Sequence, residues 1–204
     1  MGDASDQPPR ASELLQQWFD GDEDKSLGGL NDLFGRGAFA VAFVLLLAVP
    51  ALPLPTGGAT HVFEVIAMLL ALQLVVGRSE VWLPERFRRL ELAGARQQRF
   101  IERLMRLIRR LERISRPRAR FLFGGRASNI AFGLLVLAGS LGAFLAPPFT
   151  GLDTLPALGV VLLSLGVILE DAVVAIAGVA VGAGGVVLEI VLGSAVVHGV
   201  GSLL

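Results

Sequence analysis

Hydrophobic residues occur in long uncharged runs along this chain. Residues 38–52 contain no charged side chain, and a second run, His61–Val76, follows a cluster of proline, glycine and threonine at 50–60. Proline removes a backbone donor and clashes with the preceding turn, while glycine favours irregular backbone, so the cluster predicts a break between two short helices. The first run is about 22 Å long as a helix, against about 30 Å of hydrocarbon in a bilayer. The pair fits either a re-entrant hairpin or two short spans joined by a tight turn.

The same pattern returns in the second half of the chain. The apolar run 127–146 is followed by Pro147-Pro148-Phe149-Thr150-Gly151, which shares its proline, threonine and glycine with Pro53-Leu54-Pro55-Thr56-Gly57 at a constant offset. With a gap of one residue, Leu69–Leu72 then falls on Leu162–Leu165. We therefore predict two copies of a helix–break–helix unit. Because no span lies between them, both copies should enter the membrane from the same face, which favours a parallel over an inverted repeat.

A glycine-rich apolar stretch continues from Glu170-Asp171 to Leu204 and is too long for one straight span. Its Gly178-x-x-x-Gly182 spacing allows close helix contact. The stretch fits one bent helix or two short ones, and the adjacent Gly184-Gly185 favours two helices with a break there.

Basic residues gather between the two copies. Fifteen of the eighteen lysines and arginines lie at 78–126, and none follows Arg126. Within this segment, apolar residues at three-and-four spacing predict an amphipathic helix over 97–114. A basic face suits a helix on an anionic leaflet, although packing on a partner would use the same pattern. Nucleic acid is not an expected partner, because topology explains the charge and no base-reading motif accompanies it. The predicted contacts with the membrane surface are Arg99, Arg103, Arg106, Arg110 and the indole of Trp82.

Composition extends this picture to the whole chain. With 53% hydrophobic residues, 18% charged residues and a mean hydropathy of +0.67, the sequence predicts an all-α integral membrane protein. The excess of arginine predicts that residues 78–126 and the N-terminus lie in the cytoplasm. The expected organisation is a polar N-terminal segment (1–36), a first membrane hairpin (37–77), the Arg-rich region (78–126), a second hairpin (127–170) and a C-terminal helix or helix pair (171–204).

Ionisable side chains inside apolar runs are costly, and they are the candidates for chemistry. His61 and Glu64 are three residues apart on one helix face beside the first break, where they can hold a proton, a cation or a polar substrate group. The alternative is a capping His61 and a packed Glu64. Glu189 and His198 would complete a metal site only if the tail packed against the first hairpin, and we expect no metal. The predicted path residues are Thr56, Gly57, His61, Glu64, Gln73, Thr150, Gly151, Asp153, Glu170 and Asp171.

Several enzyme classes lack their signatures in this chain. There is no cysteine, which excludes thiol nucleophiles and zinc–thiolate sites. Neither a Walker nor a dinucleotide-binding glycine motif is present, and no Gly-x-Ser-x-Gly nucleophile elbow occurs. We therefore expect neither a cofactor nor catalysis.

One stretch of sequence resembles a known family. Pro50-Ala-Leu-Pro-Leu-Pro-Thr-Gly, then Ala71-Leu72-Gln73-Leu74, Gly77-Arg78 and Trp82-Leu83-Pro84 ahead of the arginine-rich helix, is similar to the ExoD family of bacterial exopolysaccharide-synthesis membrane proteins. The resemblance extends over residues 10–200 and implies an inner-membrane protein linked to exopolysaccharide production, without a mechanism. His61-x-x-Glu64 departs from the more apolar sequence of the family, which indicates a subgroup.

Three functions fit these observations. The first is a small transporter or channel-like protein whose path lies at the paired Pro-Thr-Gly breaks. The second is a non-catalytic assembly or regulatory factor for polysaccharide machinery, which acts through the basic helix. The third is a membrane enzyme on a lipid-linked substrate. A homo-oligomer is expected in each case, because so few short helices bury little surface alone.

Overall fold

The chain folds into an all-helical bundle. The computed structural model describes residues 16–17, 37–52, 60–78, 81–82, 106, 109–110, 125–146 and 150–201, with side chains as far as residue 194. No β-strand occurs in these ranges. The helices are α3 (Ala38–Leu47), α4 (His61–Val75), α7 (Arg126–Leu145), α8 (Thr154–Ile168) and α9 (Ala172–Gly201).

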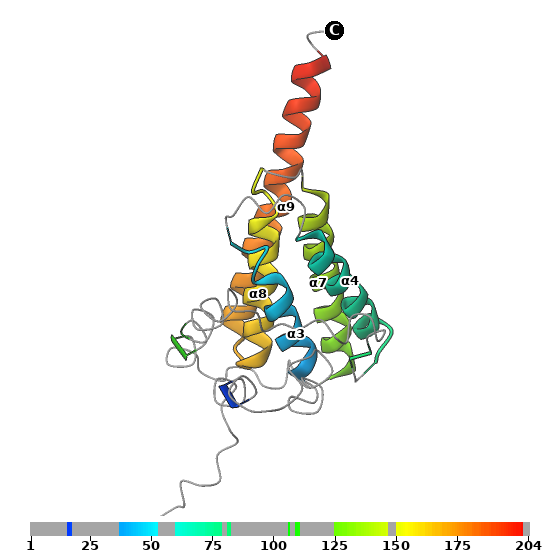
Figure 1. Cartoon of the computed structure of the whole chain (residues 1–204), viewed down its shortest axis with the longest axis vertical. Helices are drawn as coiled ribbons and strands as arrows, with labels where there is room; N and C mark the ends of the chain where they lie inside the picture. The colour runs from blue at the N-terminus through cyan, green and yellow to red at the C-terminus, as the bar shows by residue number, and fades with distance from the viewer. Residues whose placement is uncertain are drawn as a thin grey trace, which may run out of the picture.

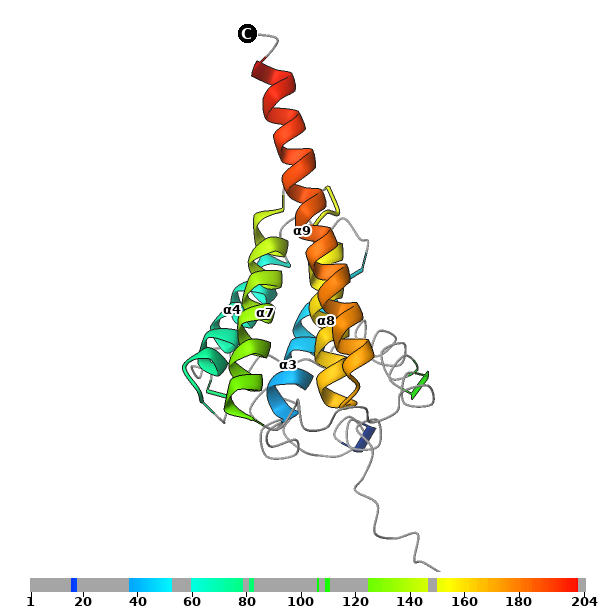
Figure 2. The same cartoon turned by 180° about the vertical axis from the view of Figure 1, so that it is seen from behind.

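The helices alternate in direction along one axis (Figures 1 and 2). α3, α7 and α9 run one way, while α4 and α8 run back. The ends of α3 and α7 and the starts of α4 and α8, with the described residues 48–52, 60, 146 and 150–153, therefore lie at one end, which we call the break end. The turns at 76–78 and 169–171 and the start of α7 lie at the other end, which we call the turn end. Both hairpins thus leave the turn end and return to it, and the last part of α9 extends past the break end.

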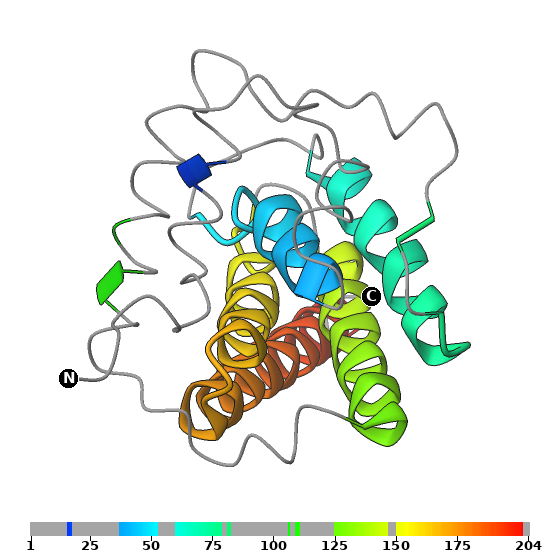
Figure 3. The ribbon, with the colours of Figure 1, turned by 90° about the horizontal axis from the view of Figure 1, so that it is seen from below.

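Helix α3 forms the centre of the bundle. All ten of its residues are buried, which agrees with a sequence that is hydrophobic on every side. Seen along the bundle, α3 lies between the α8–α9 pair and the α4–α7 pair (Figure 3). Phe43 packs edge-on against Phe132 of α7 at 5.6 Å between ring centroids. α3 ends at Leu47 and is shorter than predicted, because residues 48–52 already form turns.

The two hairpins pack against each other through both of their helices. α4 lies along α7, and α3 lies along α8. The α4–α7 contact depends on Gly133, where a Cβ would come within 2.9 Å of Leu74. These cross-contacts make one core from the two sequence units.

Helices α8 and α9 touch backbone to backbone. A side chain on Gly159 or Gly178 would collide with main-chain atoms of the other helix, so only glycine fits at either position. The predicted close contact at Gly178 and Gly182 is therefore confirmed. The antiparallel register follows four successive pairs: Pro156 with Gly185, Gly159 with Gly182, Leu163 with Gly178, and Gly166 with Ala175.

The predicted break at Gly184-Gly185 is wrong. α9 continues through both glycines to Gly201. A glycine inside a helix lowers helix stability by only about 1 kcal/mol. The absence of a side chain at Gly185 also allows Leu155 and Pro156 of α8 to pack closely against α9. Tertiary packing thus keeps this helix continuous.

Helices α4 and α8 have the same length and end in the same way. Each has 15 residues, and each is followed by a residue with left-handed backbone, Gly77 at φ +88° and Glu170 at φ +51°. The next amide then donates to a carbonyl five residues back, Arg78 to Gln73 and Asp171 to Gly166, both at 2.9 Å. This is the Schellman pattern, and it falls on the positions that the second sequence match pairs.

The outer surface of the bundle is apolar. Large exposed side chains include Leu134 and Leu145 on α7 and Ile176 and Ile190 on α9, each more than half exposed. α7 and residues 172–194 of α9 are long and apolar enough to cross a membrane, whereas α3, α4 and α8 are shorter apolar helices. Such a surface is that of a membrane-associated protein.

Candidate functional site

An ionisable pair lies at the start of α4, at the break end. The Nδ1 atom of His61 is 2.7 Å from Oε2 of Glu64, in the contact that their spacing favours. Glu64 is fully buried, and the His61 ring stacks edge-on against Phe144 of α7 at 5.1 Å. Thr60 occupies the N-cap position of α4 but makes no side-chain capping bond. The pair is therefore held by α4 and α7 together.

The second oxygen of Glu64 has no hydrogen-bond partner among the described residues. Thr60 interacts with the same carboxylate without meeting hydrogen-bond geometry at this atom. The antiparallel register that sets His61 beside Phe144 puts Ser140 one turn away, at the level of Glu64. The Ser140 hydroxyl is also fully buried and lacks a partner in the described ranges. Buried polar atoms without partners are rare, and they call for an explanation.

Two further carboxylates converge on this end. Asp153 lies in the turn before α8 and acts electrostatically on both Glu64 and Glu189. Glu189 on α9 also interacts with Glu64, and its Oε1 is buried without a partner in the described part of the chain. By sequence, no lysine or arginine occurs in 37–77 or after Arg126. Three elements thus bring three carboxyl groups together at the break end, where His61 is paired with one of them, Glu64.

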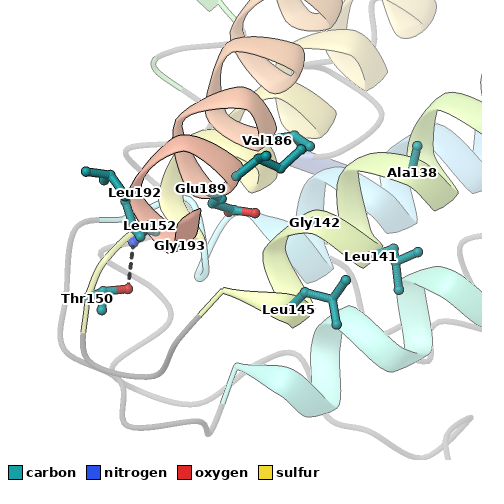
Figure 4. A pocket seen from close by; sticks show the side chains of 11 residues that line it. Ala138, Leu141, Gly142, Leu145, Thr150, Leu152, Val186, Glu189, Leu192 and Gly193 are labelled. Atoms are coloured by element: carbon teal, nitrogen blue, oxygen red, sulfur yellow. Dashed lines mark hydrogen bonds between the residues drawn. The ribbon is translucent and has the colours of Figure 1, made fainter. Parts of the chain in front are cut away.

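An apolar groove opens beside Glu189, between α7 and α9 (Figure 4). Its volume is about 1010 Å³. The Glu189 side chain extends from α9 toward α7 at Gly142, where Oε2 is 3.8 Å from the position that a Cβ would take. The close approach that Gly142 permits is that of Val186, whose Cγ2 lies 2.7 Å from the same position. In the turn that closes the groove, the Leu152 amide donates to the Thr150 hydroxyl at 3.3 Å, next to Gly151 with left-handed backbone at φ +70°.

Three of the predicted path residues lie at the turn end instead. Gln73 donates to the Trp82 carbonyl at 2.6 Å and accepts from the Trp82 amide at 2.8 Å. Asp171 accepts from the Val173 amide at 2.9 Å and caps α9, while Glu170 occupies the left-handed turn before it. Gln73 and Asp171 thus bond backbone groups near helix ends, and all three residues are separated from His61 and Glu64 by the length of α4 or α8.

The structure describes only part of the predicted path and surface residues. The path residues Thr56 and Gly57 and the surface residues Arg99 and Arg103 lie outside the described ranges. Trp82 is 59% exposed, with the Arg78 guanidinium 5.7 Å from its ring centre, and Arg106 and Arg110 are exposed and helical. No cluster of three histidine, aspartate or glutamate side chains in the described ranges has the geometry of a metal site.

Glu189 is the residue that the predicted path lacked. It is the one charged residue of the stretch from Ala172 to Leu204. A lone ionisable residue in an apolar span is a functional candidate by itself, and this signal was present in the sequence. Its position beside Glu64 required the packing of α9.

Comparisons with known proteins agree on one family. The family model described as "Exopolysaccharide synthesis, ExoD" matches residues 11–191. An uncharacterized protein of Synechocystis sp., slr1875, is 29% identical over 172 residues, which cover 83% of this chain and 80% of that protein. Protein ExoD of Rhizobium meliloti is 32% identical over 148 residues, which cover 71% of this chain and 60% of that protein's length. No solved structure matches.

Proposed function

We propose a function from the premise that this chain belongs to the ExoD family, whose members are linked to exopolysaccharide synthesis. The protein is a small transporter or channel-like component of that process, and its path lies at the break end of the bundle. His61, Glu64, Asp153 and Glu189 carry the path, with Thr150 in the turn beside it. We place the turn end in the cytoplasm, because the Arg-rich segment 78–126 leaves from it and returns to it.

One observation carries this proposal. Glu64 and Glu189 come from helices far apart in sequence, yet each keeps a buried carboxylate oxygen without a partner among the described residues. Leaving such a group unpaired in an apolar bundle costs free energy. A site that binds a cation, a proton or a polar substrate group would supply the missing partner, whereas a purely structural site would have been satisfied within the fold.

The paired architecture supports a path at this position. The matched ends of α4 and α8, the common direction of the two hairpins and their cross-packing all fit a duplicated unit with a pseudo-twofold axis along the bundle. In this arrangement the first hairpin is re-entrant, because α3 is short and enclosed by protein. Paired breaks near one axis are where transporters with parallel repeats bind their substrates.

The test is exopolysaccharide production in a bacterium that lacks its own ExoD-family protein and carries this chain instead. Glu64→Gln, which keeps the shape and removes the charge, is expected to abolish the gain in polysaccharide at normal protein levels in the membrane. Glu170→Gln makes the same chemical change at the turn end and serves as the matched control, with production expected to stay normal.

Full production with Glu64→Gln and with Glu189→Gln would refute the path. If production were instead lost on reversing Arg106 and Arg110 to glutamate, the result would support the assembly factor that acts through its basic helix. Immunoblots of membrane fractions separate both outcomes from simple loss of protein.

A further inference from the structure

The groove between α7 and α9 combines an apolar wall with one carboxylate. Leu141 and Leu145 line it from α7, and Val186 and Ile190 line it from α9. Glu189 is the one ionisable side chain in its lining. At about 1010 Å³ the groove reaches the upper end of the size range of small-molecule sites.

Carboxyl groups gather beside this groove. Asp153 and Glu64 lie close enough to Glu189 to act on it electrostatically, and His61, the basic partner on α4, pairs with Glu64 and not with Glu189. Oε1 of Glu189 is buried and has no partner among the described residues. A molecule that fills the groove therefore meets apolar side chains and a carboxyl group that lacks one hydrogen-bond partner among the described residues.

We propose that this groove binds a lipophilic organic cation, with its apolar groups between α7 and α9 and its positive charge beside Glu189. The inference rests on the proposed function, because it names a class of molecule that the path at the break end admits. Charge complementarity selects this class. A phosphate-bearing lipid brings a second negative charge to three carboxylates, and a neutral acyl chain leaves Glu189 unpaired.

The probe is tritiated tetraphenylphosphonium, measured by equilibrium binding to the purified full chain in detergent. Tetraphenylborate, an anion of nearly the same size and shape, is the matched ligand control in competition. We expect saturable binding of the cation that unlabelled cation displaces and the anion does not. Equal displacement by both ions would indicate hydrophobic partitioning and would overturn the proposal.

Two variants locate the site. Glu189→Gln is expected to weaken binding by about tenfold or more, because it removes the facing charge. Leu141→Trp is expected to weaken binding by filling the groove, whereas Leu134→Trp, on the same helix and also exposed but outside the groove lining, should leave binding unchanged. Unchanged binding in both Glu189→Gln and Leu141→Trp would refute the site.

The two proposals fail separately. If wild-type protein binds no tetraphenylphosphonium while exopolysaccharide production still depends on Glu64 and Glu189, the ligand class is wrong and the path stands. If the cation binds but Glu64→Gln and Glu189→Gln support full production, the path is wrong and the groove is a binding site of another role.

Discussion

At the turn end of the bundle, polar side chains form hydrogen bonds with backbone groups. At the break end, two carboxyl groups each have one oxygen without a hydrogen-bond partner among the described residues. Gln73 bonds both polar groups of the Trp82 backbone, and Asp171 caps α9. Glu64 and Glu189 instead retain buried oxygens with no partner in the described ranges. The bonds between Gln73 and Trp82 lie at the exposed surface, whereas the unpaired oxygens of Glu64 and Glu189 are buried.

This difference separates structural from functional polar residues within one bundle. A buried polar group that the fold satisfies contributes to stability, and its loss is felt as unfolding. A group that the fold leaves unsatisfied costs stability and persists where function needs it. The two ends should therefore respond in opposite ways to substitution.

The largest expected effect on stability comes from a substitution that separates α9 from α8. Gly178→Leu would drive a side chain into the backbone of α8 at Leu163, so we expect a loss of about 4 kcal/mol or more in the free energy of unfolding. Glu189 would then leave the break end with its helix. Denaturant titration in detergent measures the change, and Gly184→Leu is the control, because a Cβ there meets nothing within 4 Å. Similar stability of the two variants would contradict the observed α8–α9 contact.

A middle-sized effect should show the opposite behaviour of the two ends directly. Gln73→Leu removes both bonds to Trp82, and we expect a loss of about 1 kcal/mol in stability with polysaccharide production intact once protein levels are matched. Glu64→Gln should keep stability and lose production. Unfolding and polysaccharide production are measured for both variants. A Gln73 variant that is stable but inactive would show that the turn end belongs to the path.

The smallest expected effect concerns the matched ends of α4 and α8. Glu170→Gly should raise stability by about 0.5 kcal/mol, because relief of the left-handed backbone slightly exceeds the added flexibility of the unfolded chain. Gly77→Ala should lower stability by about 1 kcal/mol for the same reason in reverse. Thermal scans would register a rise of about 1–2 °C and a fall of about 2–4 °C. A fall in both variants would mean that the Glu170 side chain stabilises its turn by more than the backbone costs.

Local pattern was enough to place most of the helices. The start of α4 at His61, the extent of α7 and the break after it follow from apolar runs and from proline and glycine. The contact between His61 and Glu64 follows from their spacing on one helix. Each of these features depends on residues within a few turns of one another.

Only the tertiary structure decided which polar residues meet. Glu189 reaches the break end because glycines let α9 lie directly on α8, and the same contact keeps α9 unbroken at Gly184-Gly185. Gln73 and Asp171, which the sequence predicted as path residues, bond backbone groups at the turn end. The sequence by itself determined where the helices and breaks lie, because these depend on local backbone preferences. Whether a buried polar group finds a partner depends on distances between elements far apart in the chain, and only packing sets those distances.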